Sequence, residues 1–287
     1  LCRYLYRYKW LLFLALFLTI VSTLLGLIGP MLSGYAIVAI HGPNDVDFPK
    51  VFFYAGLMIL FYAVSSLLMY ILTRITIRFS QRIIYQMRKD VFHTLMGLPV
   101  GYFDKTQTGD IVSRISYDID TVNASLSNDL LQICTSVITV IGSLIMMLLI
   151  APLLVSVFAI TIPASIFLTR YMTRKVRPLF RKRSAKLGEL NGYSEEIISG
   201  QKTIKAYHQE ETMIGRFDVK NTEAVDAYYN ADYYGSMTGP SVNFINNLSL
   251  SLVSVLGAIL YLFQSISLGN LSSFVLYSRK FSGPINE

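Results

Sequence analysis

The sequence predicts an all-α membrane protein with six long transmembrane helices and two helical hairpins that extend beyond the bilayer. One observation is that four long stretches contain no Asp, Glu, Lys or Arg, namely 10–40, 51–73, 130–169 and 233–278. A second is that two intervening stretches hold 34 of the 43 charged residues, namely 74–129 and 170–232. A third is that the apolar residues inside those charged stretches keep a helical spacing.

The charge-free stretches have the lengths that membrane helices need. A bilayer core about 30 Å thick requires roughly 20 apolar residues per helix. The two shorter stretches each supply one span, and the two longer ones each supply two, with turns at Ala151-Pro152 and over Gln264–Asn270. Continuous apolar runs of this length exclude barrel strands, which are shorter and alternate in polarity. The predicted spans are about 10–31, 51–73, 130–150, 152–170, 236–262 and 268–287.

The distribution of basic residues predicts the orientation. Stretch 74–129 carries seven Lys or Arg residues and stretch 170–232 carries twelve, whereas the loops on the other side carry only Lys50. Because basic residues stay on the cytoplasmic side, we expect both termini and both charged stretches there. The protein is thus a predicted multi-pass protein of a cell (plasma) membrane. Its basic surface favours anionic membrane lipid as a partner over nucleic acid.

The amino-terminal segment, residues 1–30, combines basic and apolar residues as a signal peptide does. Its apolar run of about 20 residues is too long for a signal sequence, and no small-residue cleavage site ends it. We therefore interpret it as an uncleaved first span, and because the chain begins at Leu1 we expect further sequence upstream. Cys2 and Cys134 predict no disulfide framework.

The first charged stretch, 74–129, predicts a hairpin of two helices, called here the first hairpin. Its rising arm has apolar residues at every fourth position from Ile75 to Leu95. The pattern stops at Gly97-Leu98-Pro99 and resumes from Ile111 to Leu130. Each arm is about 20–24 residues, or roughly 30–36 Å long. We expect the tip of this hairpin at 98–110.

The second charged stretch predicts a similar second hairpin over 170–235. Apolar residues mark one arm from Val176 to Ile204 and the return arm from Phe217 to Tyr229, with the tip near Ala206–Gly215. Apolar stripes on helices outside the membrane must bury against something. The arms can pack on each other, whereas the tips need a docking partner or are solvated turns.

Three groups of residues carry a resemblance to a known family. The first group lies at the first tip and comprises Leu98–Lys105, Thr108–Arg114 and Asp118. The second lies at the second tip and comprises Glu195-Glu196, Ser199-Gly200, Thr203–Tyr207 and Gln209–Glu211. The third lies near the carboxyl end and comprises Gly269–Phe274, Tyr277–Arg279 and Pro284–Glu287. In this order they resemble the first and second intracellular loops and the sixth span of ABC exporter membrane domains.

The resemblance covers nearly the whole chain and is closest to bacterial multidrug or lipid half-transporters. It implies a domain-swapped dimer with a second transmembrane domain, identical or different, and nucleotide-binding domains in cis and in trans. It also implies coupling helices at Phe103–Asp110 and Ala206–Ile214, the second docking on the partner subunit's nucleotide-binding domain. The residues it implies in coupling are Phe103, Asp104, Gly109, Asp110, Ala206, Tyr207, His208, Gln209 and Glu210.

The chemistry of the tips agrees with docking. Phe103 and Tyr207 are aromatic, and aromatic side chains are common anchors of interfaces. Asp104 and Glu210 can pair with basic or hydroxyl groups around such an anchor. The alternative is that these carboxylates are solvated helix ends, and that Asp110 complements a helix dipole.

Signatures of catalysis are missing from the sequence. No Gly-Lys dipeptide occurs, so there is no phosphate loop, and Ile198–Gln201 lacks the second glycine of the nucleotide signature. The three His residues have no metal-ligand spacing, and no catalytic triad is evident. We therefore expect no catalytic residue, metal or cofactor in this chain. ATP and Mg²⁺ would bind in a nucleotide-binding domain, fused to this chain or a separate polypeptide, which would make the full-length protein an ABC-type ATPase.

Polar residues inside the predicted fifth and sixth spans are candidates for a substrate cavity. Asn243, Asn246 and Asn247 fall on one helical face, which should point away from lipid. They can line a cavity or bond to neighbouring helices, and both alternatives stay open. Tyr277 and Arg279 are the other candidates, and Arg279 can face the cavity or reach the membrane surface.

These features lead to one main hypothesis and two alternatives. The main hypothesis is the permease half of an ATP-driven exporter for hydrophobic or amphipathic drugs, lipids or peptides. A secondary transporter is the first alternative, although such proteins place broken helices and acidic residues within the bilayer, and no acidic residue lies in a predicted span here. A non-transporting membrane regulator built on the same fold is the second.

Overall fold

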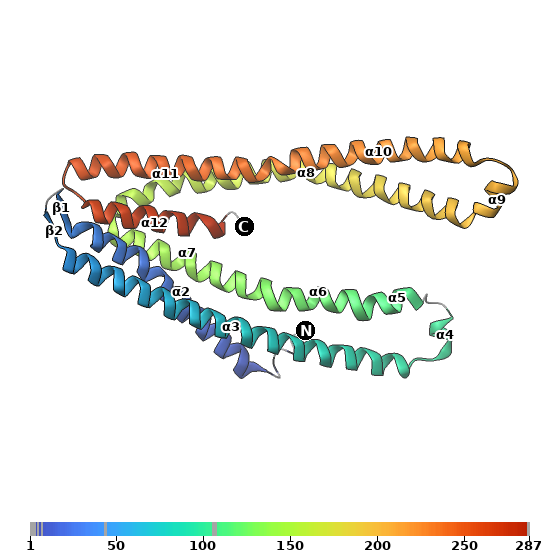
Figure 1. Cartoon of the computed structure of the whole chain (residues 1–287), viewed down its shortest axis with the longest axis horizontal. Helices are drawn as coiled ribbons and strands as arrows, with labels where there is room; N and C mark the ends of the chain where they lie inside the picture. The colour runs from blue at the N-terminus through green and yellow to red at the C-terminus, as the bar shows by residue number, and fades with distance from the viewer. Residues whose placement is uncertain (1–3, 5, 7, 43–44, 105–107, 286–287) are drawn as a thin grey trace. The chain divides into compact units, whose positions relative to one another are not determined.

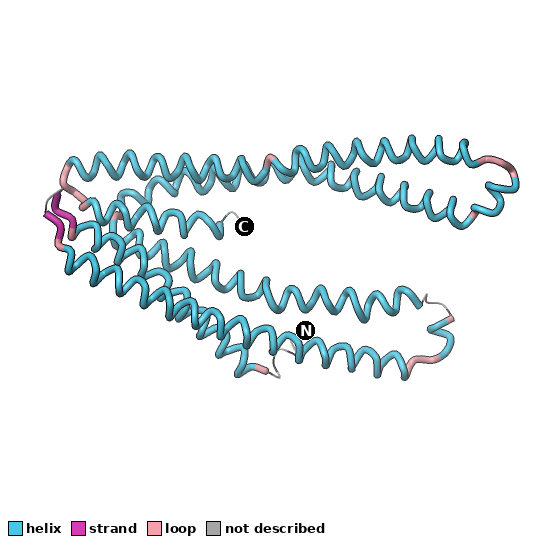
Figure 2. Tube along the Cα trace, in the orientation of Figure 1, coloured by secondary structure: helices cyan, strands magenta, loops and turns pink. Residues whose placement is uncertain are grey.

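The computed structural model describes residues 4, 6, 8–42, 45–104 and 108–285. Helices make up nearly all of this part, apart from two short strands (Figure 2), which confirms the predicted all-α class. The chain forms two compact units, one of Leu1–Val155 with Val253–Glu287 and one of Ser156–Leu252.

The first unit begins with two long helices joined by a small β-hairpin (Figure 1). Helix α2 spans Lys9–Val38, and the antiparallel strands β1 (Ile40–Gly42) and β2 (Asp45–Val46) follow it. Helix α3 spans Phe48–Met96. The strands were not predicted from the sequence, because two or three residues are too few for a periodic pattern.

Helix α3 starts where a local capping signal places it. The Asp47 side chain accepts a hydrogen bond from the Lys50 backbone N–H at 3.2 Å and pairs with the Lys50 ammonium at 2.6 Å. Pro49 lies in the first turn, where its missing N–H is not needed. The helix then continues without interruption through the predicted span and the first arm of the first hairpin to Met96.

The return arm of the first hairpin alternates α-helical and wider π-helical turns. It comprises α4 (Val100–Phe103), α5 (Thr108–Ser113), η1 (Arg114–Asp118), α6 (Ile119–Ala124), η2 (Ser125–Asp129) and α7 (Leu130–Ile150). An α-helix has 3.6 residues per turn, so apolar residues repeated every four positions drift around it. Wider turns offset this drift and keep residues such as Ile115 and Ile119 at least half-buried.

Helix α12 (Leu268–Ile285) completes the first unit by packing against α2 and α7. Its buried residues Phe274, Tyr277 and Phe281 lie on one face at spacings of three and four. The loop before α12 follows α11 (Thr238–Leu262), close to the predicted turn over Gln264–Asn270.

The second unit contains most of α8 (Pro152–Ser199) and α11, together with α9 (Gln201–Ala206) and α10 (Glu210–Ser236). Helix α10 runs alongside α8 (Figure 1). The buried face of α10 consists of small residues, namely Ala224, Ala227 and Ala231.

Five helical segments are long and apolar enough to cross a membrane: Lys9–Val38, Phe48–Met96, Ile111–Ile150, Pro152–Ser199 and Glu210–Leu262. Helix α12 is not among them, because its 18 residues, which include Asn270, Arg279 and Lys280, are not apolar enough. The sixth span therefore stays a prediction, as do the cytoplasmic location of the hairpins and the domain-swapped dimer. The five apolar segments agree with a membrane protein.

Candidate functional site

Arg183 fastens the two arms of the second hairpin together. Its guanidinium on α8 donates to the Asp232 carboxylate on α10 at 2.7 Å. The same group lies 4.1 Å from the centre of the Tyr228 ring and 5.1 Å from that of Phe180. One cation thus joins a carboxylate and two aromatic rings, which fixes its position better than a single exposed ion pair would.

A second cross-arm contact lies one helical turn nearer the tip. Lys186 on α8 pairs with Glu189 and with Glu223 on α10, both at 2.8 Å. Hydrogen bonds to Glu189 and Glu223 raise the pKa of Lys186, and the hydrogen bond from Lys186 lowers the pKa of Glu223. Both carboxylates are exposed and Lys186 is partly exposed, so the contact aligns the arms more than it stabilises them.

The second tip is a compact turn with defined hydrogen bonds. Helix α9 ends at Ala206, and the Gln209 N–H donates to the Ile204 carbonyl at 3.1 Å. The His208 N–H donates to the Lys205 carbonyl at 3.3 Å, and His208 has a φ of 51°. Together these features form a Schellman motif, whose left-handed position usually holds glycine. A histidine there shows that the turn is held by its surroundings at some conformational cost.

The predicted coupling residues of the second tip lie at and around this turn. Tyr207 is 73% exposed, and Glu210 is half-buried at the first turn of α10. The other three are exposed, namely Ala206, His208 and Gln209. The separate short helix is Gln201–Ala206, because Gly200 interrupts the long arm there. The predicted coupling segment Ala206–Ile214 therefore contains the turn and the beginning of α10.

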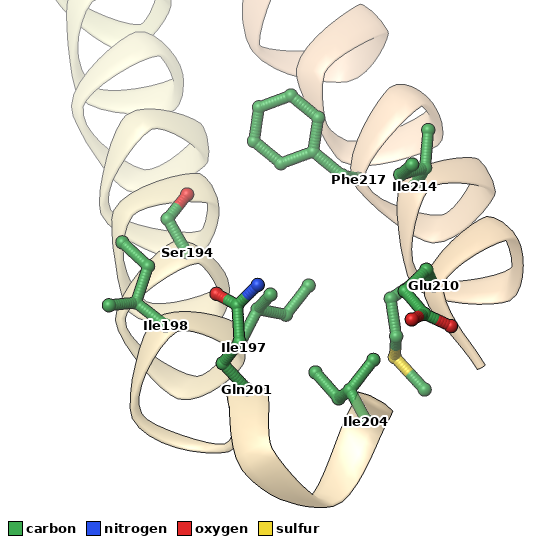
Figure 3. A pocket seen from close by; sticks show the side chains of 9 residues that line it. Ser194, Ile197, Ile198, Gln201, Ile204, Glu210, Ile214 and Phe217 are labelled. Atoms are coloured by element: carbon green, nitrogen blue, oxygen red, sulfur yellow. The ribbon is translucent and has the colours of Figure 1, made fainter. Parts of the chain in front are cut away.

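Between the arms near this tip lies an apolar pocket of about 410 Å³ (Figure 3). Figure 3 shows Ser194 and Ile197 on the α8 side facing Ile214 and Phe217 on α10. The pocket is lined by Ser194, Ile197, Ile198, Gln201, Ile204, Glu210, Met213, Ile214 and Phe217. Both sides of the tip thus leave apolar surface uncovered within this chain.

The two arms of the first hairpin are joined by polar contacts, and a small apolar core lies nearby. Arg88 on α3 pairs with Asp120 on α6 at 2.6 Å, and Ser80 donates to the Asn123 side-chain oxygen at 2.6 Å. Nearby, Phe79 and Ile83 form a buried cluster against which Tyr4, Tyr8, Leu11, Leu12, Met87 and Val122 pack.

At the first tip, the short helix α4 carries Phe103 on its last turn. Phe103 is 40% exposed and packs edge-to-face on Tyr102 at 5.6 Å between ring centres. Asp104 is exposed, and Gly109 is exposed with open space around it. The middle of the predicted coupling segment, 105–107, and the Asp110 side chain lie outside the described residues.

The candidate cavity residues of the fifth span lie on α11. Its side towards α8 contains Ser249, which shares a hydrogen bond of 3.2 Å with Thr161. Asn243 and Asn247 are exposed, and Asn246 is half-buried. The side chains of two of the three asparagines are thus exposed on the surface of the second unit.

The candidate Tyr277 on α12 is fully buried. Its hydroxyl donates to the Leu27 carbonyl of α2 at 2.5 Å, and Ser273 donates to the Pro30 carbonyl at 2.9 Å. Tyr277 therefore joins two helices in this conformation. Arg279, in contrast, is exposed.

Lys280 was not predicted from the sequence to have a role, and the structure gives it a specific partner. Pro30 has no N–H, which leaves the Gly26 carbonyl without its usual partner within the helix. The Lys280 ammonium donates to that carbonyl at 3.1 Å. The sequence shows Pro30 and the helical spacing of Ser273, Tyr277 and Lys280. It does not show that Lys280 lies beside the carbonyl that Pro30 leaves without a partner.

Glycines allow α2 and α12 to approach closely at this contact. A Cβ on Gly34 would collide with Ser273 and lie 2.6 Å from the Gly269 carbonyl oxygen. A Cβ on Gly269 would collide with the Gly34 carbonyl in turn. Such small-residue crossings are typical of helices packed within membranes.

Among the described residues, no group of three or more His, Cys, Asp or Glu side chains could hold a metal ion. The arrangement consists instead of two helical hairpins with exposed tips and an apolar helical body.

The ABC transporter transmembrane region family matches residues 12–285, and the chain belongs to this family. The resemblance to ABC exporter membrane domains that the tip residues indicated is thereby confirmed.

Several curated relatives are similar over most of the chain. An uncharacterized ABC transporter ATP-binding protein, YfiC, of Bacillus subtilis (strain 168) is 33% identical over 99% of this chain. A fatty acid ABC transporter ATP-binding/permease protein of Mycobacterium bovis is 32% identical over 90% of it. A putative multidrug export ATP-binding/permease protein of Staphylococcus aureus (strain NCTC 8325 / PS 47) is 26% identical over 71% of it. The matches span 47%, 40% and 36% of these relatives, so the chain corresponds to half or less of each.

Proposed function

We propose that this chain is the permease half of an ATP-driven exporter that moves hydrophobic or amphipathic compounds by alternating access. A second transmembrane domain, identical or related, would complete the path through the membrane. Nucleotide-binding domains, in cis and in trans, would bind ATP with Mg²⁺ and hydrolyse it. The names of the relatives, which include ATP-binding/permease proteins, support this division of work.

The observation that carries the proposal is the construction of the second hairpin. Its arms are joined at Arg183 and at Lys186, while Tyr207 stands exposed at the tip. A displacement at the tip reaches the membrane only if the arms do not slide along each other. Cross-arm contacts oppose that sliding, so the hairpin can move as one body when a partner domain moves the tip.

The proposed docking sites are the two tips. Phe103 and Tyr207 would insert into grooves of the nucleotide-binding domains, with Asp104 and Glu210 pairing at the edges of these contacts. The second tip would dock on the nucleotide-binding domain of the partner subunit. Gly109 and Asp110 would belong to the first contact, together with the segment 105–107.

The cargo proposal rests on the apolar character of the body and on the relatives. A relative named for fatty acids and one named for multidrug export both favour an apolar or amphipathic cargo. Asn243, Asn246 and Asn247 are the proposed polar contacts in the path, and Arg279 is a further one. Tyr277 could join them only in a conformation in which α12 moves away from α2.

The proposed location is a bacterial plasma membrane with both termini in the cytoplasm. The excess of Lys and Arg in both hairpins supports this orientation, and the bacterial relatives support the membrane.

The proposal is tested by ATPase activity of the complete transporter in proteoliposomes. Tyr207→Ala and Phe103→Ala should each lower turnover several-fold while nucleotide binding is retained, because they would loosen docking without touching the ATP site. Tyr85→Ala, a change of an equally exposed aromatic residue (70%) on an arm, is the matched control and should leave turnover unchanged. Full activity of both tip variants would refute coupling at the tips.

A further inference from the structure

A groove lies between α8 and α11 within the second unit and has a volume of about 650 Å³. Its walls are almost entirely apolar. They are formed by Ala164, Phe167, Leu168, Pro240, Ser241, Phe244 and Ile245. Phe167 is 74% exposed and Phe244 is 68% exposed, so large aromatic surfaces line an open space that no other part of the described chain fills.

At each end of the groove, a contact joins α8 to the opposite side of the unit, which consists of α10 and α11. At the deeper end, Thr161 and Ser249 share a hydrogen bond of 3.2 Å. At the other end, a Cβ on Gly235 would lie 3.1 Å from the Phe180 ring, so the Phe180 side chain packs against the backbone of α10 there. The residues that line the groove lie between these two contacts along both sides.

The face of α8 that lines the groove continues into a polar end. Ala164, Leu168, Tyr171 and Lys175 follow one another at helical spacings of three and four. The Lys175 ammonium lies 4.8 Å from the centre of the Tyr171 ring. Hydrogen bonding to Tyr171, aided electrostatically by Tyr171 and Tyr234, raises the pKa of Lys175. Tyr171 and Lys175 thus follow Leu168, the last α8 residue that lines the groove, by about one and two helical turns.

The surrounding charge is strongly positive. Between residues 170 and 188 the sequence has eight basic residues, and between 130 and 188 it has no acidic one. Asp232, on the facing α10, is already paired with Arg183 at 2.7 Å. A negatively charged group next to Lys175 would therefore be attracted by this positively charged segment. Basic clusters directly outside a membrane helix are typical sites for anionic lipid headgroups.

The dimensions fit one leaflet of a bilayer. Ala164 and Lys175 are 11 positions apart, or about 16 Å along an α-helix. Half of a bilayer core is about 15 Å thick. An acyl chain lying in the groove would therefore place its headgroup near Lys175.

We propose that this groove is a binding site for an anionic phospholipid of the cytoplasmic leaflet, with an acyl chain against Phe167 and Phe244 and the phosphate at Lys175. Tyr171 and Tyr234 border the headgroup, as aromatic residues do at membrane surfaces. The site relies on the cytoplasmic orientation proposed above, but not on any transport activity.

The test measures lipid retention by the intact, detergent-purified protein with native mass spectrometry, in the absence of ATP. Phosphatidylglycerol and phosphatidylcholine of equal chain length are added in equal amounts. The expected result is preferential binding of phosphatidylglycerol, and a loss of about fivefold in its affinity in Lys175→Gln, as one basic residue near an anionic surface contributes. Lys182→Gln, which removes a basic residue farther from the groove, is the control and should retain wild-type affinity.

A second variant tests the apolar part. Ala164→Trp fills the groove and should weaken binding of both lipids, while monodispersity in size-exclusion chromatography reports correct folding.

Equal losses of phosphatidylglycerol affinity in Lys175→Gln and Lys182→Gln, or equal binding of the two lipids, would overturn the proposal. So would competition by glycerol phosphate as strong as that by the lipid, since the site would then take a free anion. Cross-linking of Phe244→Cys to a second copy of the chain would show that another protomer fills the groove instead. None of these results depends on ATPase activity, so failure of the lipid-binding proposal can be distinguished from failure of the proposed transport function.

Discussion

Replacement of Gly34 by Ala should destabilise the contact between α2 and α12. The added Cβ would lie 2.6 Å from the Gly269 carbonyl oxygen, whereas ordinary contacts begin at about 3.4 Å. The helices must therefore move apart by roughly 1 Å, because the obstacle is backbone that cannot rotate away.

The size of the effect follows from what this movement disturbs. Overpacking of a tight contact costs about 1–3 kcal/mol. The hydrogen bond from Ser273 to Pro30, now 2.9 Å, would lengthen beyond bonding range, at about 0.6 kcal/mol for a membrane helix pair. Alanine returns up to about 1 kcal/mol through its higher helix propensity. We expect a net loss of about 1–3 kcal/mol.

The assay is the apparent Tm of the detergent-purified protein, measured by the fraction that stays monodisperse after heating. Gly56→Ala is the matched control, because it lies in a long apolar helix and a Cβ there meets no atom within 4 Å. It should leave Tm unchanged or raise it slightly. At about 2–4 °C per kcal/mol, Gly34→Ala should lower Tm by roughly 2–12 °C. Equal Tm values for the two variants would refute the close approach of α2 and α12.

Three further predictions concern Lys280, the backbone of His208, and the ion pair of Lys186 and Glu223. Lys280→Met should increase the hydrogen exchange of the α2 amides around Pro30. The free energy of unfolding should change by less than about 1 kcal/mol, because loss of the hydrogen bond to Gly26 is offset by removal of a half-buried charge. Unchanged exchange would contradict this prediction. His208→Gly should stabilise the second tip by up to about 1 kcal/mol by relieving its left-handed backbone, seen as slower proteolysis at the tip, and faster cleavage would argue against it. The contact between Lys186 and Glu223 should be fully present above about pH 4.5 and should be lost only as pH falls through the lowered pKa that Glu223 has in the folded hairpin. On the alkaline side it should be fully present below about pH 10.5 and be lost only as pH rises through the raised pKa of Lys186. Distances between spin labels on α8 and α10 should broaden below this range in the wild type but show no such acid step in Glu223→Gln.

The positions of the helices and their breaks were largely predictable from the sequence. The turn at Ala151 and the helix end before Gly97-Leu98-Pro99 follow from steric signals that act over a few residues. Motifs at the tips likewise identified the family from residues close together in the chain. The short helix Gln201–Ala206 was not predicted, because Gly200 ends the arm before the apolar pattern does, and the coupling segment Ala206–Ile214 stays a prediction.

The contacts within the candidate site were less predictable. Arg183 stood out only as one basic residue among many, and its choice of Asp232 and Tyr228 depends on how the arms align. The wide turns of the first hairpin arise because an apolar repeat of four must face α3, which local propensity does not encode.

The sequence by itself thus determined the apolar segments, the two hairpins and the family, because hydropathy, helix breakers and motifs are local properties of the chain. Only the tertiary structure decided which polar groups meet. Lys280 and Gly26 are 254 residues apart, and the carbonyl that Pro30 leaves free finds its donor only because the glycines of α2 and α12 let these helices pack closely. Such pairings depend on the three-dimensional packing of distant helices, and no local pattern specifies them.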